Sequence, residues 1–309
     1  MKTIVNSIAL LVLSHNFGLA DDAVKPISDI LQPTEIEQSA SFDRKIEVFG
    51  IRVMAMPDVT SRDLTLCANI LAQWIDNDED GMPDNSIVLD EILKRNSYMV
   101  LGVSGKRIGA WHENSQDVMG YGEPAYGLDV SSINHNWYRL QPSEYSQDHY
   151  RTDGLFPPDG GSEETFHLIT DLGYGNAYPK VFGRGGEDGK DERSILTLAM
   201  DNARGGFFPR ERSLYPKGAW YTRKDPCSYQ CFVGEYIHWG MITLLGFNME
   251  RGDAIQDQWS ITDADSLKKR DTALYKLLTN PEYRFPKIAP DGSYSRFEQG
   301  GSENGEQLK

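Results

Sequence analysis

Apolar residues recur at intervals of three and four along several stretches of the chain, which is the spacing of one buried helix face. The clearest case is residues 62–75, which follow Ser61, a favourable N-cap. Its apolar stripe consists of Leu64, Cys67, Ile70, Leu71 and Trp74. Further helices are expected at 86–94, 161–173, 194–203, 232–247 and 265–278. Because Cys67 lies on the stripe, we expect its thiol to be buried.

Two stretches near the N-terminus have the composition of strands instead. Residues 45–56 are rich in strand-forming side chains and read as one strand with a bulge at Gly50. A second strand is expected at 97–103, and the many glycines, prolines and aromatic residues of 104–160 predict irregular structure with short strands. These elements predict an α+β fold, in which a small N-terminal sheet packs on a mostly helical C-terminal part.

The two ends of the chain differ in composition from the residues between them. Residues 1–20 combine a basic start, an apolar run and small residues before the end, which is the pattern of a secretory signal peptide. We therefore expect a secreted, extracellular protein whose mature chain begins near Asp21. The Gly/Ser/Glu-rich stretch 291–309 is expected to be a disordered tail, which leaves 21–290 as a single globular domain.

The chain has three cysteines. In an oxidising compartment, Cys227 and Cys231 are spaced to close a small disulfide loop at the start of a helix, leaving Cys67 free. Three cysteines are too few for a disulfide scaffold. The hydrophobic core must therefore hold the fold.

The densest cluster of carboxylates lies between the first two expected helices. Aspartates at alternating positions, followed by Gly81, resemble the first half of an EF-hand-type calcium loop. The predicted calcium ligands are Asp76, Asp78, Asp80 and Asp84. The stretch departs from a full loop at Ile87, where a bidentate glutamate is expected, and Asp90 or Glu91 is a candidate for the later ligand. The competing interpretation is a solvated acidic turn.

The excess of acidic over basic residues limits the classes of partner that the chain is expected to bind. A formal net charge of −15 repels nucleic acid and anionic membrane surfaces and attracts cations. We therefore expect a small-molecule or peptide substrate, with neither nucleic acid nor membrane as a partner. The aromatic and basic stretch 207–226 is a local exception, and Arg210 and Arg223 within it are candidates for binding an anionic group of a substrate.

Two of the expected helices carry residues that bind metals. The first carries Glu163, Glu164 and His167, whose spacings of three and four residues direct them to one side of a helix. The second is a long apolar helix that carries Glu235 and His238. Polar groups on such helices need partners, and a metal ion is one way to satisfy them. Together they predict a divalent transition-metal site of zinc or iron, with Glu163, His167, Glu235 and His238 as ligands.

The segment Glu163-Glu164-x-x-His167 resembles the active-site helix of the zincin metallopeptidases, whose motif is His-Glu-x-x-His. The resemblance implies that Glu164 is the general base and His167 a metal ligand. It also implies that Glu235 completes the site, as a helical glutamate does in the gluzincin branch. The chain departs from the motif at Glu163, which stands where a zincin has its first histidine. The implied function is that of a metal-dependent hydrolase.

Two other interpretations use the same residues. Paired Glu-x-x-His helices also assemble iron sites that activate oxygen, so a metal-dependent oxidoreductase is the first alternative. Secreted oxygenases, including luciferases released by marine animals, belong to this class. The second alternative is a non-enzymatic, calcium-stabilised extracellular protein. In that case the glutamates are paired with arginine or lysine and the histidines are hydrogen-bonded core residues.

Overall fold

The computed structural model describes residues 42, 44–103, 126–129, 160–186, 188–190, 193–249 and 255–294. The predicted signal peptide and the stretch from 295 onward lie outside these ranges, as does most of 104–159. The described elements are β1 (Arg44–Val48), β2 (Ile51–Ala55), α2 (Ser61–Ile75), α3 (Ser86–Lys94), β3 (Tyr98–Gly102), β4 (Tyr126–Asp129), α6 (Gly160–His167), the π-helix η4 (Leu168–Tyr174), α7 (Gly175–Ala177), α8 (Pro179–Phe182), α9 (Ile195–Arg204), α10 (Tyr229–Leu244), α12 (Ala264–Arg270) and α13 (Thr272–Thr279).

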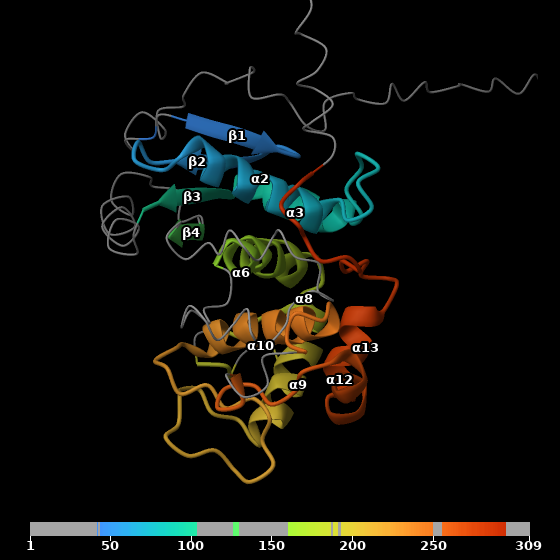
Figure 1. Cartoon of the computed structure of the whole chain (residues 1–309). Coiled ribbons are helices and arrows are strands. Elements are labelled where there is room, and N and C mark those ends of the chain that lie inside the picture. Colours follow the sequence, from blue (N-terminus) through green and yellow to red (C-terminus); the bar gives the residue numbers. More distant parts are fainter. Residues whose placement is uncertain are drawn as a thin grey trace, which may run out of the picture.

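The described strands form one sheet in the order β1-β2-β3-β4. The first pair is antiparallel, and the other two pairs are parallel. Figure 1 shows this sheet with α2 and α3 in one half of the molecule and α9, α10, α12 and α13 in the other, with α6 between them. The predicted α+β class, with a small N-terminal sheet and mostly helices after it, is therefore confirmed. None of the described helices is long and apolar enough to cross a membrane.

The prediction of a single bulged strand at 45–56 is wrong, because these residues form the β1–β2 hairpin. Val48 pairs with Ile51, so Phe49 and Gly50 form a two-residue turn. Both turn residues have positive φ, 48° and 86°, as the tight turns that match the twist of a hairpin require. Glycine adopts such a φ easily and phenylalanine rarely does, so the dipeptide is a poor turn signal.

Helices α2 and α3 begin close to their predicted positions. The N-cap of α2 is Thr60 rather than Ser61, and its side chain accepts the backbone N–H of Asp63. Asn85 caps α3 in the same way. As predicted, Cys67 is a buried free thiol, with its Sγ 3.4 Å from the Sδ of Met99.

The helix predicted at 161–173 does not end at Gly173. Helix α6 passes at Leu168 directly into η4, and the helical run continues to Ala177. Gly173 serves packing instead, since a Cβ there would lie 2.5 Å from the Cγ1 of Val88 on α3. A short π-helical stretch inside a longer helix is uncommon and is frequently found at functional sites.

The single helix predicted at 265–278 is two helices, which meet at Asp271. This residue is the C-cap of α12 and the N-cap of α13, where its Oδ1 accepts the N–H of Leu274 at 3.1 Å. Its Oδ2 accepts hydrogen bonds from Trp220 at 2.8 Å and Tyr236 at 2.6 Å. These distant donors fix the carboxylate at the break between the helices.

The chain beyond α13 returns to the N-terminal half, where it lies beside α2 (Figure 1). Gln73 of α2 accepts the backbone N–H groups of Asp291 and Gly292, and Tyr294 is buried and donates its hydroxyl to Asp76. The tail was predicted to be disordered from 291. Residues 291–294 are instead packed against the body of the protein, because α2 supplies partners for their backbone.

Candidate metal site

Four side chains from two helices converge between the halves of the molecule. Glu163 and His167 lie one turn apart on α6, while Glu235 and His238 lie one turn apart on α10. One potential ligand atom from each of the four lies within 4.8 Å of all the others. The Nε2 of His167 is 3.9 Å from an oxygen of Glu163 and 3.9 Å from an oxygen of Glu235. The structure thus brings together the four residues that the sequence predicted as transition-metal ligands.

A glycine lets the two helices approach at this point. A Cβ on Gly234 would lie 3.3 Å from the Nδ1 of His167 and 3.5 Å from an oxygen of Asp171. Gly234 immediately precedes Glu235, so the close contact with His167 lies next to the residue that supplies the carboxylate. This glycine was not singled out in the sequence, since its role depends on which helix it faces.

The cluster is largely removed from water. Three of its four side chains belong to buried residues, and Glu163 is half-buried. Burial opposes ionisation of Glu163, but the neighbouring His167 and the other nearby cations outweigh it and lower its pKa. Burial likewise opposes a charge on His167, but four surrounding carboxylates, with Glu163 first, raise its pKa. Burial raises the pKa of Glu235. The cluster therefore holds several charged or chargeable groups in a small volume.

Glu164 lies beside the cluster and is not one of the four converging residues. Burial, with the negative charges of Glu163 and Glu235, raises its pKa to about 7, against the opposing effect of His167. A carboxyl group in this range can both accept and release a proton near neutral pH.

Two arginines hold carboxylates at the site. Arg223, a predicted substrate-binding residue, has its Nη1 2.7 Å from the Oε2 of Glu235, which leaves Oε1 facing His167. Arg184 has its Nη1 2.5 Å from the Oδ2 of Asp171, a buried residue one turn after His167. Neither Asp171 nor Arg184 was predicted as a site residue from the sequence. Asp171 follows His167 by four residues, and this spacing was the available signal.

The other predicted substrate-binding residue, Arg210, is exposed in the loop between α9 and α10. Its carbonyl accepts a hydrogen bond from Arg204, the last residue of α9, at 3.0 Å. Arg204 is fully buried and packs its guanidinium 4.0 Å from the ring centre of Phe232 on α10. This contact uses the backbone of Arg210 and does not test whether its side chain binds a substrate. The substrate role of Arg210 stays a prediction.

The predicted disulfide between Cys227 and Cys231 is present at the start of α10. Ser228, between the two cysteines, is the N-cap of the helix and accepts the N–H of Cys231 at 3.2 Å. The disulfide and the cap together define where α10 begins, six residues before Glu235.

The acidic loop joins α2 to α3 and forms a second cluster. Oxygens of Asp76, Asp78 and Asp80 lie within 4.8 Å of one another. Asp76 is fully buried and accepts the N–H groups of Asp80 and Gly81, and burial raises its pKa. Asp84, the fourth predicted calcium ligand, is outside this group and accepts the N–H of Asn77 at 2.7 Å.

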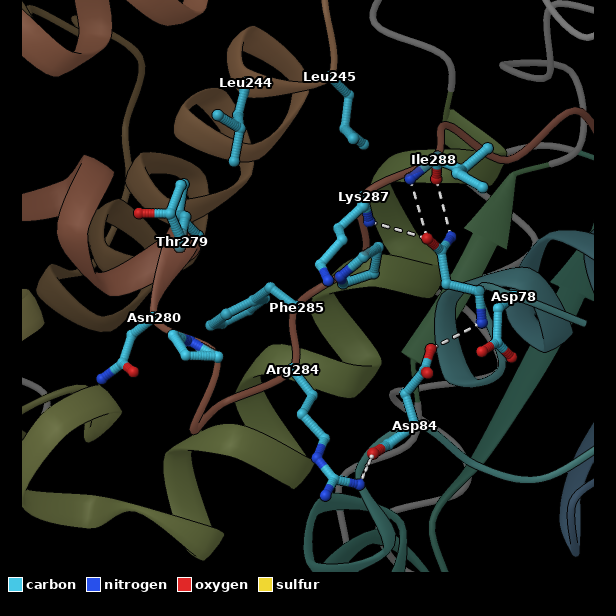
Figure 2. Close-up of a pocket in the computed structure, with 14 residues that line it drawn as sticks. Asp78, Asp84, Leu244, Leu245, Thr279, Asn280, Arg284, Phe285, Lys287 and Ile288 are labelled. Carbon is cyan, nitrogen blue, oxygen red and sulfur yellow. Dashed lines mark hydrogen bonds between the residues drawn. The ribbon is translucent and has the colours of Figure 1, made fainter. Parts of the chain in front are cut away.

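A pocket of about 760 Å³ lies beside the acidic loop, not at the Glu/His cluster. Figure 2 shows Phe285 and Leu245 on its apolar side, with Asp78 and Asp84 of the loop across from them. Lys287 and Arg284 are further charged residues of its wall. The pocket combines apolar surface with charges of both signs, and none of the four cluster residues lines it.

Comparisons with family models, curated proteins and solved structures found no match for this chain.

Proposed function

We propose that the protein is a metal-dependent enzyme, a hydrolase with a zincin-like but divergent site. The observation that carries this proposal is the convergence of Glu163, His167, Glu235 and His238 from two helices. Burying several ionisable groups together is costly unless they are paired or bind a metal. Two carboxylates and two imidazoles are a donor set that suits zinc or iron.

The spacing of the cluster fits a single ion. Ligand atoms around a tetrahedral zinc, with bonds of about 2.0–2.1 Å, lie about 3.3–3.4 Å apart. The two separations of 3.9 Å at the Nε2 of His167 are larger by about 0.5 Å, a gap that small side-chain rotations close. The ion pair between Arg223 and Glu235 is the kind of outer contact that orients a ligating carboxylate.

The residues around the cluster supply the rest of a hydrolytic site. A bound zinc ion lowers the pKa of water and polarises a carbonyl group. Glu164, half-buried next to the ligand Glu163 and with a pKa near 7, is the candidate to take the proton that such a water loses. Arg210 is the remaining candidate for an anionic group of a peptide or small-molecule substrate, because Arg223 is engaged with Glu235.

The test of this function separates metal binding from chemistry. Purified wild-type protein is analysed for metals and assayed for peptide hydrolysis beside two variants. We expect stoichiometric zinc in the wild type, none in His167→Ala, and in Glu164→Gln full zinc content with activity lowered at least about 100-fold. A wild-type protein without transition metal, or a Glu164→Gln variant as active as wild type, contradicts the proposal.

One observation favours the oxidoreductase as a second candidate. Four protein ligands leave zinc a fifth position for water only by expanding its tetrahedral coordination, whereas a six-coordinate iron with the same four ligands keeps two positions for oxygen or substrate. Stoichiometric iron instead of zinc in the same metal analysis, with oxygen consumption on reduction, selects this function. Finding calcium alone, unaffected by His167→Ala, selects the non-enzymatic alternative.

We also propose that the acidic loop binds calcium through Asp76, Asp78 and Asp80. Three convergent carboxylates at alternating positions support this proposal, since calcium takes oxygen ligands. Calcium should raise the melting temperature of the wild type and leave that of Asp78→Ala unchanged, as measured by calorimetry with and without chelator. Asp265→Ala, which removes an exposed carboxylate on α12, is the control and should respond like wild type. A wild-type protein whose melting temperature does not change with calcium contradicts the calcium site.

We also propose that the protein is secreted. This is supported by the signal-like pattern of residues 1–20 and by the disulfide between Cys227 and Cys231, since such bonds persist in oxidising compartments. Expression in a secreting host followed by N-terminal sequencing should place the mature end near Asp21. A product that stays inside the cell with Met1 intact contradicts this.

A further inference from the structure

His167 presents its two ring nitrogens to different surroundings. Its Nε2 faces the carboxylates of Glu163 and Glu235, each 3.9 Å away. Its Nδ1 faces α10, 3.3 Å from the position of a Cβ on Gly234. Only one nitrogen can bind the metal of the cluster, so the group that meets the other nitrogen determines which tautomer the ring adopts.

Asp171 lies on the Nδ1 side of this ring. An oxygen of its carboxylate is 3.5 Å from the same Cβ position on Gly234, so it and Nδ1 flank one point of α10. The residue is buried in η4, one turn along the same helical run from His167.

Arg184 fixes the far side of the carboxylate. Its Nη1 is 2.5 Å from the Oδ2 of Asp171, which leaves Oδ1 as the oxygen beside Gly234. The ion pair joins η4 to the segment that follows α8 (Pro179–Phe182). The carboxylate is thus paired with an arginine through one oxygen, and its other oxygen lies near the same point of α10 as Nδ1 of His167.

We propose that Asp171 is a positioning residue for the metal site, which accepts the Nδ1–H of His167 and directs Nε2 toward the metal. This inference rests on the proposed function, because it requires that the cluster bind a metal. A carboxylate that receives the second N–H of a ligating histidine fixes the orientation of the ring and strengthens it as a ligand. Arg184 acts one step further out, as the anchor of Asp171.

The chain contains a matched control for a purely structural role. Asp201 on α9 is buried to the same extent as Asp171, with 7% of each residue exposed, and it is also paired with an arginine, Arg193. Its other partner is the hydroxyl of Tyr229 at 3.1 Å, and it is not part of the Glu/His cluster. Replacing either aspartate by asparagine therefore removes a buried ion pair, but only one replacement alters the support of His167.

The experiment measures zinc affinity of the whole chain by competition with a chromophoric chelator. We expect Asp171→Asn to weaken zinc binding by about 10–100-fold and Asp201→Asn to leave it within about twofold of wild type. Melting of the zinc-free proteins is recorded in parallel, and we expect both variants to lose stability. Equal zinc affinity in Asp171→Asn and wild type overturns the inference, and so does equal weakening in both variants.

A second variant tests the inference if Asp171→Asn does not fold. Arg184→Gln leaves the carboxylate in place and removes its anchor, and we expect zinc binding to weaken several-fold. Unchanged affinity in Arg184→Gln then overturns the inference. These results also separate the inference from the proposed function. A wild-type protein that binds no zinc or iron rejects the metal site itself. A wild type that binds zinc, with unchanged zinc affinity in Asp171→Asn, rejects only the positioning role.

Discussion

Asp271 links three separate parts of the helical half through a single carboxylate. Trp220 and Tyr236 donate to one of its oxygens, and the N-terminus of α13 donates to the other. The position was predicted as an ordinary residue within one helix, since a charged residue among Lys268, Lys269 and Arg270 looks like a solvated face. The break could not be predicted because both side-chain donors come from elsewhere in the chain.

The buried carboxylate of Asp271 makes the stability of the fold depend on pH, in a direction that its pKa shift determines. Burial raises the pKa of Asp271 above its usual value of 3.8, even though its hydrogen bonds oppose the shift. Between the unfolded and folded pKa values, the folded chain retains a proton that the unfolded chain has released. Its contribution to the free energy of unfolding is therefore largest at acid pH and is lost as the pH rises through the folded pKa.

We expect Asp271→Asn to remove this pH dependence. The variant should be less stable than wild type by about 1–3 kcal/mol, because the N–H of Trp220 loses its acceptor. The difference should narrow as the pH rises above about 4 and through the raised pKa of the folded state. Urea unfolding across this range measures it, with the exposed Asp265→Asn as control. A constant difference at every pH contradicts the prediction.

Helix α10 was predicted from its apolar run, and its boundaries moved by only a few residues. What the sequence did not indicate is how its two faces differ. Gly234 lies against His167 and Asp171, whereas Gly240 lies against Leu274 of α13, where a Cβ would meet the leucine Cδ2 at 2.3 Å. In an isolated sequence both are glycines within an apolar helix, and only tertiary packing distinguishes them.

The two glycines should respond differently to the same substitution. Alanine favours a helix over glycine by about 1 kcal/mol, so any loss must come from packing. Gly234→Ala should retain its melting temperature and bind zinc about tenfold more weakly, as the ligand helices are pushed apart. Gly240→Ala should be destabilised by about 1–3 kcal/mol through overpacking and keep its zinc affinity. Wild-type zinc binding by Gly234→Ala would count against the close approach.

At the scale of the molecule, the sequence indicated the fold class and the four converging residues but not the connections between the halves. Periodicity and composition are local properties, and they located most helices and the strand at β3. The hairpin at Phe49 and Gly50, the packed residues 291–294 and the pairing of Arg223 with Glu235 each depend on partners or turn geometry that no local pattern contains.

The last described residues should stabilise the acidic loop. Tyr294 donates to Asp76, so Tyr294→Phe removes a hydrogen bond to a carboxylate while it keeps the buried ring. We expect the variant to lose about 1.5–3 kcal/mol in urea unfolding. Tyr275→Phe is the control, because the Tyr275 hydroxyl makes no hydrogen bond with the described residues, and it should change stability by less than about 0.5 kcal/mol. Equal losses in the two variants contradict the role of Tyr294.

The contact between Tyr294 and Asp76 spans 218 residues of chain. During synthesis, Asp76 leaves the ribosome long before Tyr294 is made, so the acidic loop can form its local hydrogen bonds first but lacks this contact. Contacts so distant in sequence form slowly, because a large loop must close first. The contact between Asp76 and Tyr294 therefore forms late in synthesis and slowly, after the loop's local hydrogen bonds.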